Sequence, residues 1–238
     1  MRIGPQFLLT VALIAATTNS VNATDRHAEE ATCSVVEEAA RTHQVSVEML
    51  TRLIWFESRF DIGAISHVGA EGIAQFMPAT AAERGLSDPF DVDQAILQAA
   101  SYLADLNRQF GNFGLAIAAY NAGPHRVANW LDNSGALPRE TSFLVLAVTG
   151  RSAEDWAAFG PYMRLPFIVE PLSCLKSRAI LRSIRSIDYD PDRGRLTAEL
   201  KESGRSLPTI AQSGRLLPDI GQSGFLIRGM VQSSRALP

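Results

Sequence analysis

The amino-acid sequence predicts a mainly α-helical protein with at most a minor β element, followed by a low-complexity C-terminal tail. Apolar residues recur at helical spacing through most of residues 29–146, and residues that favour helix ends bound these stretches. The 238 residues are 46% hydrophobic, which is enough to form one substantial core. We therefore expect a single helical body.

Each helix is predicted from its spacing and its end residues. Alanine, valine and cysteine recur at helical spacing over residues 28–43. Ser46 suits the N-cap of a helix over residues 47–56, and Asp91 suits that of a longer helix that stops at Gly111. Further helices are expected over residues 78–85, 115–120, 124–130, from 138 onward, and over 153–159 and 176–187. Residues 58–75 contain two glycine-bearing turns, which are compatible with a short β-hairpin or with an irregular loop.

The first 23 residues have the pattern of a secretory signal peptide. Arg2 precedes an apolar run over residues 7–16, and the segment ends in Val21-Asn22-Ala23, a typical cleavage site. No apolar run reaches the roughly 18 residues that cross a bilayer. We expect cleavage after Ala23 and a periplasmic or secreted protein without an integral membrane segment.

The charge distribution and the missing motifs exclude several classes of function. Residues 1–170 contain 11 basic and 19 acidic residues, whereas residues 171–238 contain 11 and 6. The basic part has few aromatic residues and no recognition motif, so nucleic acid is not an expected partner. The chain has no phosphate-binding glycine motif and no zinc-ligand spacing.

Cys33 and Cys174 are the only cysteines in the sequence. In an oxidising compartment such a pair most often forms a disulfide, and the alternative is two separate buried thiols. A bridge between them would tie the start of the mature chain to a segment near residue 174.

The end of the chain repeats with a period of ten residues. The pattern Ser-Gly-Arg-Ser/Leu-Leu-Pro begins at Ser203 and Ser213, and related copies begin at Ser223 and Ser233. A period this short, with glycine and proline, predicts disorder rather than a core. The repeats are compatible with multivalent docking to a partner or with neutral expansion.

Glu57 is the candidate catalytic residue. It follows Leu50, Leu53 and Ile54 at i+7, i+4 and i+3, so its carboxyl lies on the apolar stripe of the predicted helix. Apolar surroundings raise the pKa of a carboxyl, and a protonated carboxyl can donate its proton to a leaving oxygen. A glutamate at a helix end can also turn outward or cap an amide, so this placement alone leaves both interpretations open.

Three segments together resemble the lytic transglycosylase family. They are Glu57-Ser58-Arg59-Phe60, residues 72–81 (Gly-Ile-Ala-Gln-Phe-Met-Pro-Ala-Thr-Ala) and residues 119–124 (Ala-Tyr-Asn-Ala-Gly-Pro). Pro138-Arg139-Glu140-Thr141 resembles a later element of the family. The resemblance covers residues 33–150 and implies a lysozyme-like helical domain.

The resemblance also implies roles for individual residues. Glu57 would be the single catalytic acid and base. The other residues that the resemblance assigns to the site support the turn, line the cleft or contact N-acetyl sugars: Ser58, Gly72, Ile73, Ala74, Gln75, Tyr120 and Asn121. Glu140 would orient the loops around the site, or serve only as a favourable charge at a helix start. Two positions depart from the common family pattern: Ala74 replaces a larger side chain, and a tyrosine after Thr141 is missing.

The implied reaction cleaves the β-1,4 bond between N-acetylmuramic acid and N-acetylglucosamine in peptidoglycan. It leaves a 1,6-anhydro ring on the muramic acid and requires no metal or cofactor. Simple hydrolysis would need a second carboxylate, for which Glu71 is a candidate. A binding scaffold without turnover is another class to be tested.

The predicted organisation is therefore a signal peptide (1–23), a lytic transglycosylase catalytic domain (24–160), a C-terminal extension (161–202) and a repeat tail (203–238). Small enzymes of this family often serve secretion or conjugation machines, so the tail is a candidate docking segment for such a machine.

Overall fold

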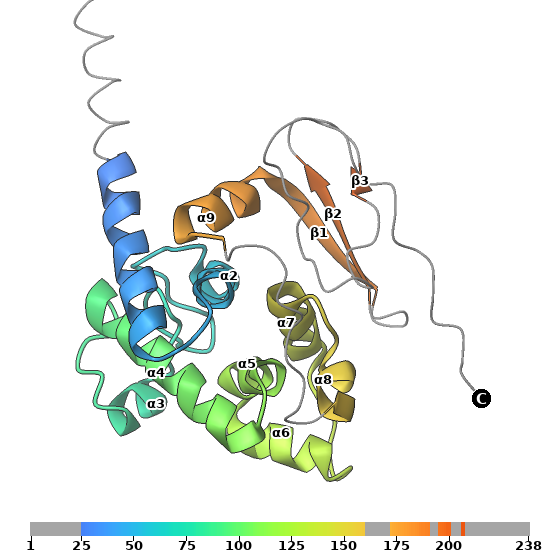
Figure 1. Ribbon diagram of the computed structural model, residues 1–238. Helices are drawn as coiled ribbons and strands as arrows, with labels where there is room; N and C mark the ends of the chain where they lie inside the picture. The colour runs from blue at the N-terminus through green and yellow to red at the C-terminus, as the bar shows by residue number, and fades with distance from the viewer. Residues whose placement is uncertain (1–24, 160–171, 191–194, 201–205, 208–238) are drawn as a thin grey trace, which may run out of the picture.

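The computed structural model describes residues 25–159, 172–190, 195–200 and 206–207 (Figure 1). The predicted signal peptide lies outside these residues, as does the predicted tail apart from residues 206–207. The described part is mainly helical and carries one small antiparallel sheet, which confirms the predicted fold class. Among the described residues, no helix combines the length and the apolar character needed to cross a membrane.

The helices agree closely with the predicted ones. Ser46 caps its helix by accepting the amide of Met49 at 3.4 Å, and Asp91 accepts that of Gln94 at 3.0 Å. Gly111 ends the longest helix in a left-handed conformation, with φ of 81°. The helices are residues 25–42, α2 (Val47–Ser58), α3 (Pro78–Glu83), α4 (Val92–Phe110), α5 (Phe113–Ala122), α6 (Pro124–Leu131), α7 (Arg139–Thr149), α8 (Ala153–Phe159) and α9 (Cys174–Ser183).

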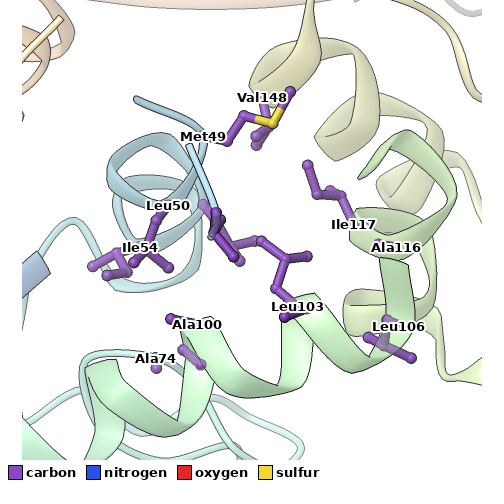
Figure 2. Close-up of a cluster of buried hydrophobic side chains, with 14 of the residues drawn as sticks. Met49, Leu50, Ile54, Ala74, Ala100, Leu103, Leu106, Ala116, Ile117 and Val148 are labelled. Carbon is purple, nitrogen blue, oxygen red and sulfur yellow. The ribbon is translucent and has the colours of Figure 1, made fainter. Parts of the chain in front are cut away.

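The core forms around α2 (Figures 1 and 2). Helix α2 contacts α7 and α9, and its buried side chains share one core cluster with those of α4 and α5. Leu50 and Ile54 on α2 are fully buried, and they belong to the same core cluster as Leu103 of α4 and Ile117 of α5. Burying an aliphatic side chain of this size stabilises a fold by roughly 1.5–3 kcal/mol. The helix that carries Glu57 is therefore held in place by apolar packing over most of its length.

The segment between α2 and α3 is an irregular loop, one of the two predicted alternatives. Isolated antiparallel β-bridges, which join Glu71 to Ile65 and to Phe76, hold the loop in its conformation. The backbones of Glu71 and Phe76 exchange hydrogen bonds of 2.9 and 3.0 Å. This tight loop returns the chain beside the end of α2.

The C-terminal sheet is the main difference from the prediction. It consists of β1 (Ile184–Asp190), β2 (Arg195–Leu200) and β3 (Ser206–Leu207), in that order. The predicted helix over residues 176–187 is wrong beyond Ser183, because residues 184–187 belong to β1. A bulge between Ile184 and Ser186 interrupts the apolar alternation and hides the strand in the sequence. The sheet packs on α7, where Leu196 and Ala198 meet Leu146 and Ala147.

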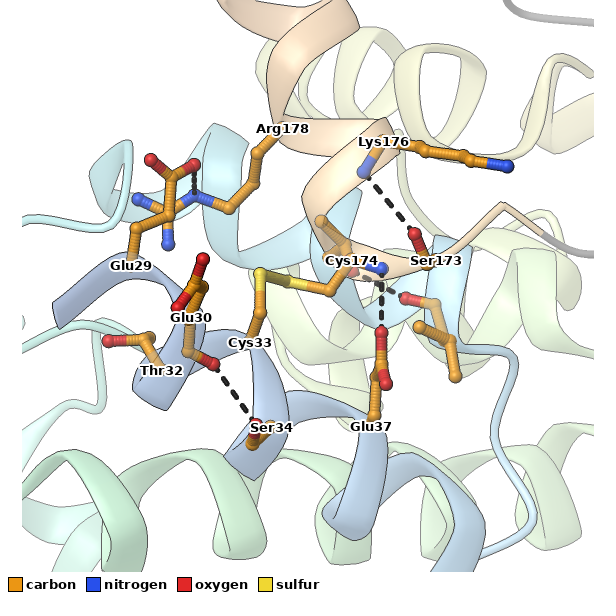
Figure 3. The surroundings of a disulfide bond; sticks show 12 residues. Glu29, Glu30, Thr32, Cys33, Ser34, Glu37, Ser173, Cys174, Lys176 and Arg178 are labelled. Carbon is orange, nitrogen blue, oxygen red and sulfur yellow. Dashed lines mark hydrogen bonds and ion pairs between the residues drawn. A yellow bond between two sulfur atoms is a disulfide. The ribbon is translucent and has the colours of Figure 1, made fainter. Parts of the chain in front are cut away.

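Helix α9 is bound covalently to the first helix (Figure 3). Cys33 and Cys174 form the disulfide that the sequence predicts. Beside the bridge, the amide of Cys174 donates to the Glu37 carboxylate at 3.1 Å. Glu29 pairs with Arg178 at 3.3 Å and with Arg182 at 2.6 Å. The extension after residue 172 therefore packs as part of the helical body.

Candidate active site

Glu57 lies in the last turn of α2. The apolar stripe predicted from the sequence is present, because Leu50, Leu53 and Ile54 are buried in the core. Glu57 itself is half-buried, and its Oε1 is shielded from solvent without a hydrogen-bond partner among the described residues. A buried polar atom of this kind costs free energy unless a ligand satisfies it.

The surroundings of Glu57 favour its protonated form. Burial raises the pKa of its carboxyl from 4.5 to about 8, and the negative charge of Glu140 adds to this effect. At neutral pH the carboxyl therefore holds a proton that it can donate. This is the electrostatic state that a general acid needs.

Ser58 connects the end of α2 to the loop at residues 72–75. Its hydroxyl donates to the backbone oxygen of Ile73 at 2.6 Å. The side chains of Ile73 and Ala74 are buried in the core, so only their backbone groups remain available near Glu57. The family resemblance implies that the backbone of these residues lines the cleft, and the structure shows that their carbonyl oxygens accept hydrogen bonds from Ser58 and Tyr120.

Gly72 is required by the close approach of another backbone segment. Its φ is +71°, and a Cβ at this position would lie 1.9 Å from the carbonyl oxygen of Pro89. No other residue fits here without moving one of the two segments. Gly72 therefore fixes the distance between the loop and the start of α4.

The Gln75 side chain is engaged within the same loop. Its amide nitrogen donates to the carbonyl oxygens of Gly72 at 2.9 Å and of Ala64 at 3.2 Å. Both amide hydrogens are thereby used, which leaves the side-chain oxygen as the group that can accept a hydrogen bond from a ligand.

Tyr120 joins α5 to this loop. Its hydroxyl donates to the Ala74 carbonyl oxygen at 2.8 Å, and its ring packs against Phe76 and Tyr102. Burial, and then the nearby charge of Glu57, raise the pKa of Tyr120 well above its ordinary value. The hydroxyl is therefore neutral and close enough to Glu57 to interact with it electrostatically, while its hydrogen points to Ala74.

A hydrogen bond between α5 and α7 fixes the positions of Asn121 and of the first turn of α7, which carries Glu140. The hydroxyl of Thr141 donates to the side-chain oxygen of Asn121 at 2.7 Å. Glu140 precedes Thr141 in the first turn of α7, where it is exposed to solvent. The structure thus brings Glu57, Ser58, Tyr120, the 72–75 loop and the first turn of α7 together.

Some contacts of this region were not predicted. The guanidinium of Arg178 lies 3.9 Å from the ring centroid of Phe60. Phe56 packs edge-on against Phe143, which in turn packs against Tyr189. No local pattern marks these residues, because each contact joins segments that are more than 40 residues apart in the sequence. Among the described residues, no group of three or more histidine, cysteine or acidic side chains is placed to hold a metal ion.

Comparisons with known proteins agree with this geometry. A family model described as "Transglycosylase SLT domain" matches residues 34–143. The chain is 36% identical over 96 residues to membrane-bound lytic murein transglycosylase F of Desulfosudis oleivorans, and 42% identical over 89 residues to soluble lytic murein transglycosylase of Escherichia coli. These alignments cover 37% and 33% of this chain, but only 21% and 14% of the relatives.

A solved structure of the lytic transglycosylase Slt from Pseudomonas aeruginosa, in an inactive variant, is 28% identical to this chain. That alignment covers 62% of this chain and 23% of the other, with a TM-score of 0.41. The motifs around Glu57, the 72–75 loop and Tyr120 all fall within the matched segment. Residues 34–143, which contain these motifs, thus match the family model of the transglycosylase SLT domain.

Proposed function

We propose that this protein is a lytic transglycosylase that cleaves the β-1,4 bond between N-acetylmuramic acid and N-acetylglucosamine in peptidoglycan. The observation that carries the proposal is the Glu57 carboxyl, which is protonated near neutral pH and has an oxygen without a partner among the described residues. Two similar proteins are named lytic murein transglycosylases, and murein is peptidoglycan.

The proposed reaction needs one carboxyl on the protein. Glu57 donates its proton to the oxygen of the departing N-acetylglucosamine as the bond from that oxygen to C1 of the muramic acid breaks. The N-acetyl group of the substrate assists at C1, and the 6-hydroxyl oxygen then forms the new bond to C1. Its proton returns to the Glu57 carboxylate, which restores the enzyme. No water is consumed, so a second carboxylate is unnecessary.

The other site residues serve to position groups in this proposal. Ser58 and Tyr120 hold the 72–75 loop through the carbonyl oxygens of Ile73 and Ala74. The side-chain oxygen of Gln75 is the acceptor that the loop offers to an N-acetyl N–H group. Asn121 holds α7, and with it Glu140, beside Glu57.

A hydrolytic muramidase is the second candidate, because the structure supplies a carboxylate near Glu57. That carboxylate is Glu140, whose charge raises the pKa of Glu57. The candidate named from the sequence, Glu71, is half-buried, and its backbone closes the 71–76 loop. If Glu140 activates a water molecule, the products carry reducing muramic acid ends.

Mass spectrometry of muropeptides after digestion tests both candidates. Native protein, Glu57→Gln and Glu140→Gln are incubated with purified peptidoglycan. Anhydromuramic products from the native protein and from Glu140→Gln, but not from Glu57→Gln, support the transglycosylase. Reducing products that require Glu140 support the muramidase, and no products from any of the three support a binding scaffold.

The proposed location is the periplasm or the cell exterior. A disulfide between Cys33 and Cys174 favours an oxidising compartment, where peptidoglycan is also found. We further propose that the repeats over residues 203–238 dock the enzyme to a secretion or conjugation apparatus. Deleting residues 208–238, which leaves β3 in place, should abolish co-purification with that apparatus and leave muropeptide release by the purified enzyme unchanged.

A further inference from the structure

Phe56 and Phe60 lie close to Glu57 in the sequence, and each contacts residues beyond the matched domain, either directly or through one neighbour. Phe60 follows Glu57 by three residues, and Arg178 of α9 stacks on its ring at 3.9 Å. Phe56 immediately precedes Glu57 and packs against Phe143 at 5.7 Å between ring centroids. Tyr189 of β1 also packs against Phe143, with 5.9 Å between the two ring centroids.

The segments that supply these contacts are firmly attached to the helical body. Helix α9 is joined to the first helix by the Cys33–Cys174 bridge (Figure 3). Arg178 is 6% exposed and pairs with Glu29, so its position is set by a buried ionic contact as well as by Phe60. Strand β1 lies against α7, because Ile187 and Tyr189 belong to the small apolar cluster that contains Leu146.

We propose that Arg178 and Tyr189 are positioning residues for the catalytic turn, which hold Phe60 and Phe56 in place and so keep water away from the Glu57 carboxyl. The inference concerns the same carboxyl as the proposed function and rests on it. It assigns a role in the site to α9 and β1, which lie beyond residues 34–143.

The physical basis is that burial is the larger cause of the raised Glu57 pKa. Water that enters beside Phe56 or Phe60 would stabilise the carboxylate and lower this pKa. The charged and titratable groups around the turn are Glu140 on α7, Tyr120 on α5, Arg59 on the turn itself and Arg178 on α9. Tyr189 is uncharged near neutral pH, because the ordinary pKa of a tyrosine is about 10 and burial raises that of Tyr189 further. Its removal therefore tests packing without removing a charge.

The titration of Glu57 can be measured without any assay of activity. Full-length protein is labelled with ¹³C at the glutamate carboxyl, and the Glu57 signal is identified by its loss in Glu57→Gln. In Tyr189→Ala the midpoint of this titration should fall by about one pH unit. It should stay at the native value in Tyr189→Phe, which keeps the ring, and in Thr197→Ala, an exposed position on the same sheet.

Arg178→Gln provides a second and independent test. It uncovers Phe60 without touching the sheet, and Glu29 keeps Arg182 as its partner. Loss of the positive charge would by itself raise the Glu57 midpoint, so the lower midpoint that we again expect reports the entry of water. If the midpoint stays at the native value in both Tyr189→Ala and Arg178→Gln while their melting temperatures fall, the two residues are only structural and the inference is overturned.

Activity profiles separate this inference from the proposed function. The basic limb of kcat/KM on peptidoglycan should move to lower pH together with the titration midpoint, and only in Tyr189→Ala and Arg178→Gln. If native protein releases no muropeptides but the midpoint still moves, the proposed function fails and the positioning role stands. If native protein is active and the Glu57 midpoint does not change in the variants, the positioning role fails and the proposed function stands.

Discussion

Glu57 combines a chemical advantage with a cost to stability. Its carboxyl keeps a proton near neutral pH because it is buried, and the same burial disfavours the charged form in the folded protein. The unfolded chain has no such restriction, since its carboxyl titrates in water. In the proposed function, folding and catalysis therefore respond to pH through the same side chain.

We expect Glu57 to make the protein less stable as the pH rises from about 4.5 to about 8. In this interval the unfolded state has released the proton and the folded state retains it, so the free energy of unfolding falls with pH. The full effect, reached above pH 8, is at most about 5 kcal/mol. Urea unfolding at pH 5, 7 and 9 should show this decline in native protein and a flatter dependence in Glu57→Gln. The exposed control Glu30→Gln should follow the native protein, and parallel curves for all three would contradict the expectation.

A second residue-scale prediction concerns Gly72. Gly72→Ala places a Cβ 1.9 Å from the Pro89 carbonyl oxygen at a φ of +71°, so either the loop or the start of α4 must move. We expect a loss of more than about 2 kcal/mol in the free energy of unfolding, with lower activity in the protein that remains folded. Gly63→Ala is the matched control, because its Cβ would meet nothing closer than Asp61 Oδ1 at 3.7 Å. Equal stability of the two variants would show that the loop yields easily.

At the scale of elements, both ends of α2 fix the position of the Glu57 carboxyl. Ser46 begins the helix, and Arg59 ends it in a left-handed conformation with φ of 56°. Ser58 and the loop at residues 72–75 hold the C-terminal end through the bond to Ile73. The position of Glu57 therefore depends on where this helix starts and stops, as well as on its apolar face.

Removing the cap should test the first of these ends. Ser46→Ala removes the acceptor of the Met49 amide and should cost about 1 kcal/mol of stability. Ser46→Asp supplies another capping oxygen and should retain most of that stability. Thermal unfolding of the three proteins measures the difference. Equal melting temperatures for Ser46→Ala and native protein would mean that solvent replaces the cap.

Elements with local signals could be predicted, and elements that depend on distant contacts could not. Ser46 and Asp91 each accept a backbone amide at the start of their helix, as their sequence context predicts. The bulge in β1 removed the alternation that would have marked the strand.

In the candidate site, too, local features could be predicted and distant contacts could not. The buried placement of Glu57 could be predicted from helical spacing, because that spacing is a local property. The bonds from Ser58 and Tyr120 to the 72–75 loop, and the stacking of Arg178 on Phe60, depend on how distant segments pack.

At the scale of the whole molecule, one bridge closes most of the chain into a loop. Cys33 and Cys174 are 141 residues apart, and all three motifs of the site lie between them. Cross-linking two residues at this separation stabilises a fold by roughly 4–5 kcal/mol in the chain-entropy model. Glu29, Arg178 and Arg182 add ionic contacts beside the bridge.

We expect reduction of this bridge to lower the melting temperature substantially. Native protein is compared with and without a thiol reductant, alongside a variant with both Cys33→Ser and Cys174→Ser. The double variant should melt near the temperature of the reduced native protein and should not respond to the reductant. A native melting temperature that is unaffected by complete reduction, verified by thiol titration, would show that packing alone secures α9.

The position of Cys174 also sets the order of events during biosynthesis. A ribosome produces the polypeptide from its amino end, so Cys174 emerges after Glu57, Gln75 and Tyr120 have all been made. The covalent closure cannot precede that moment. A nascent polypeptide that stops short of Cys174 carries every motif of the candidate site but cannot form the disulfide, and it also lacks Arg178 and Tyr189.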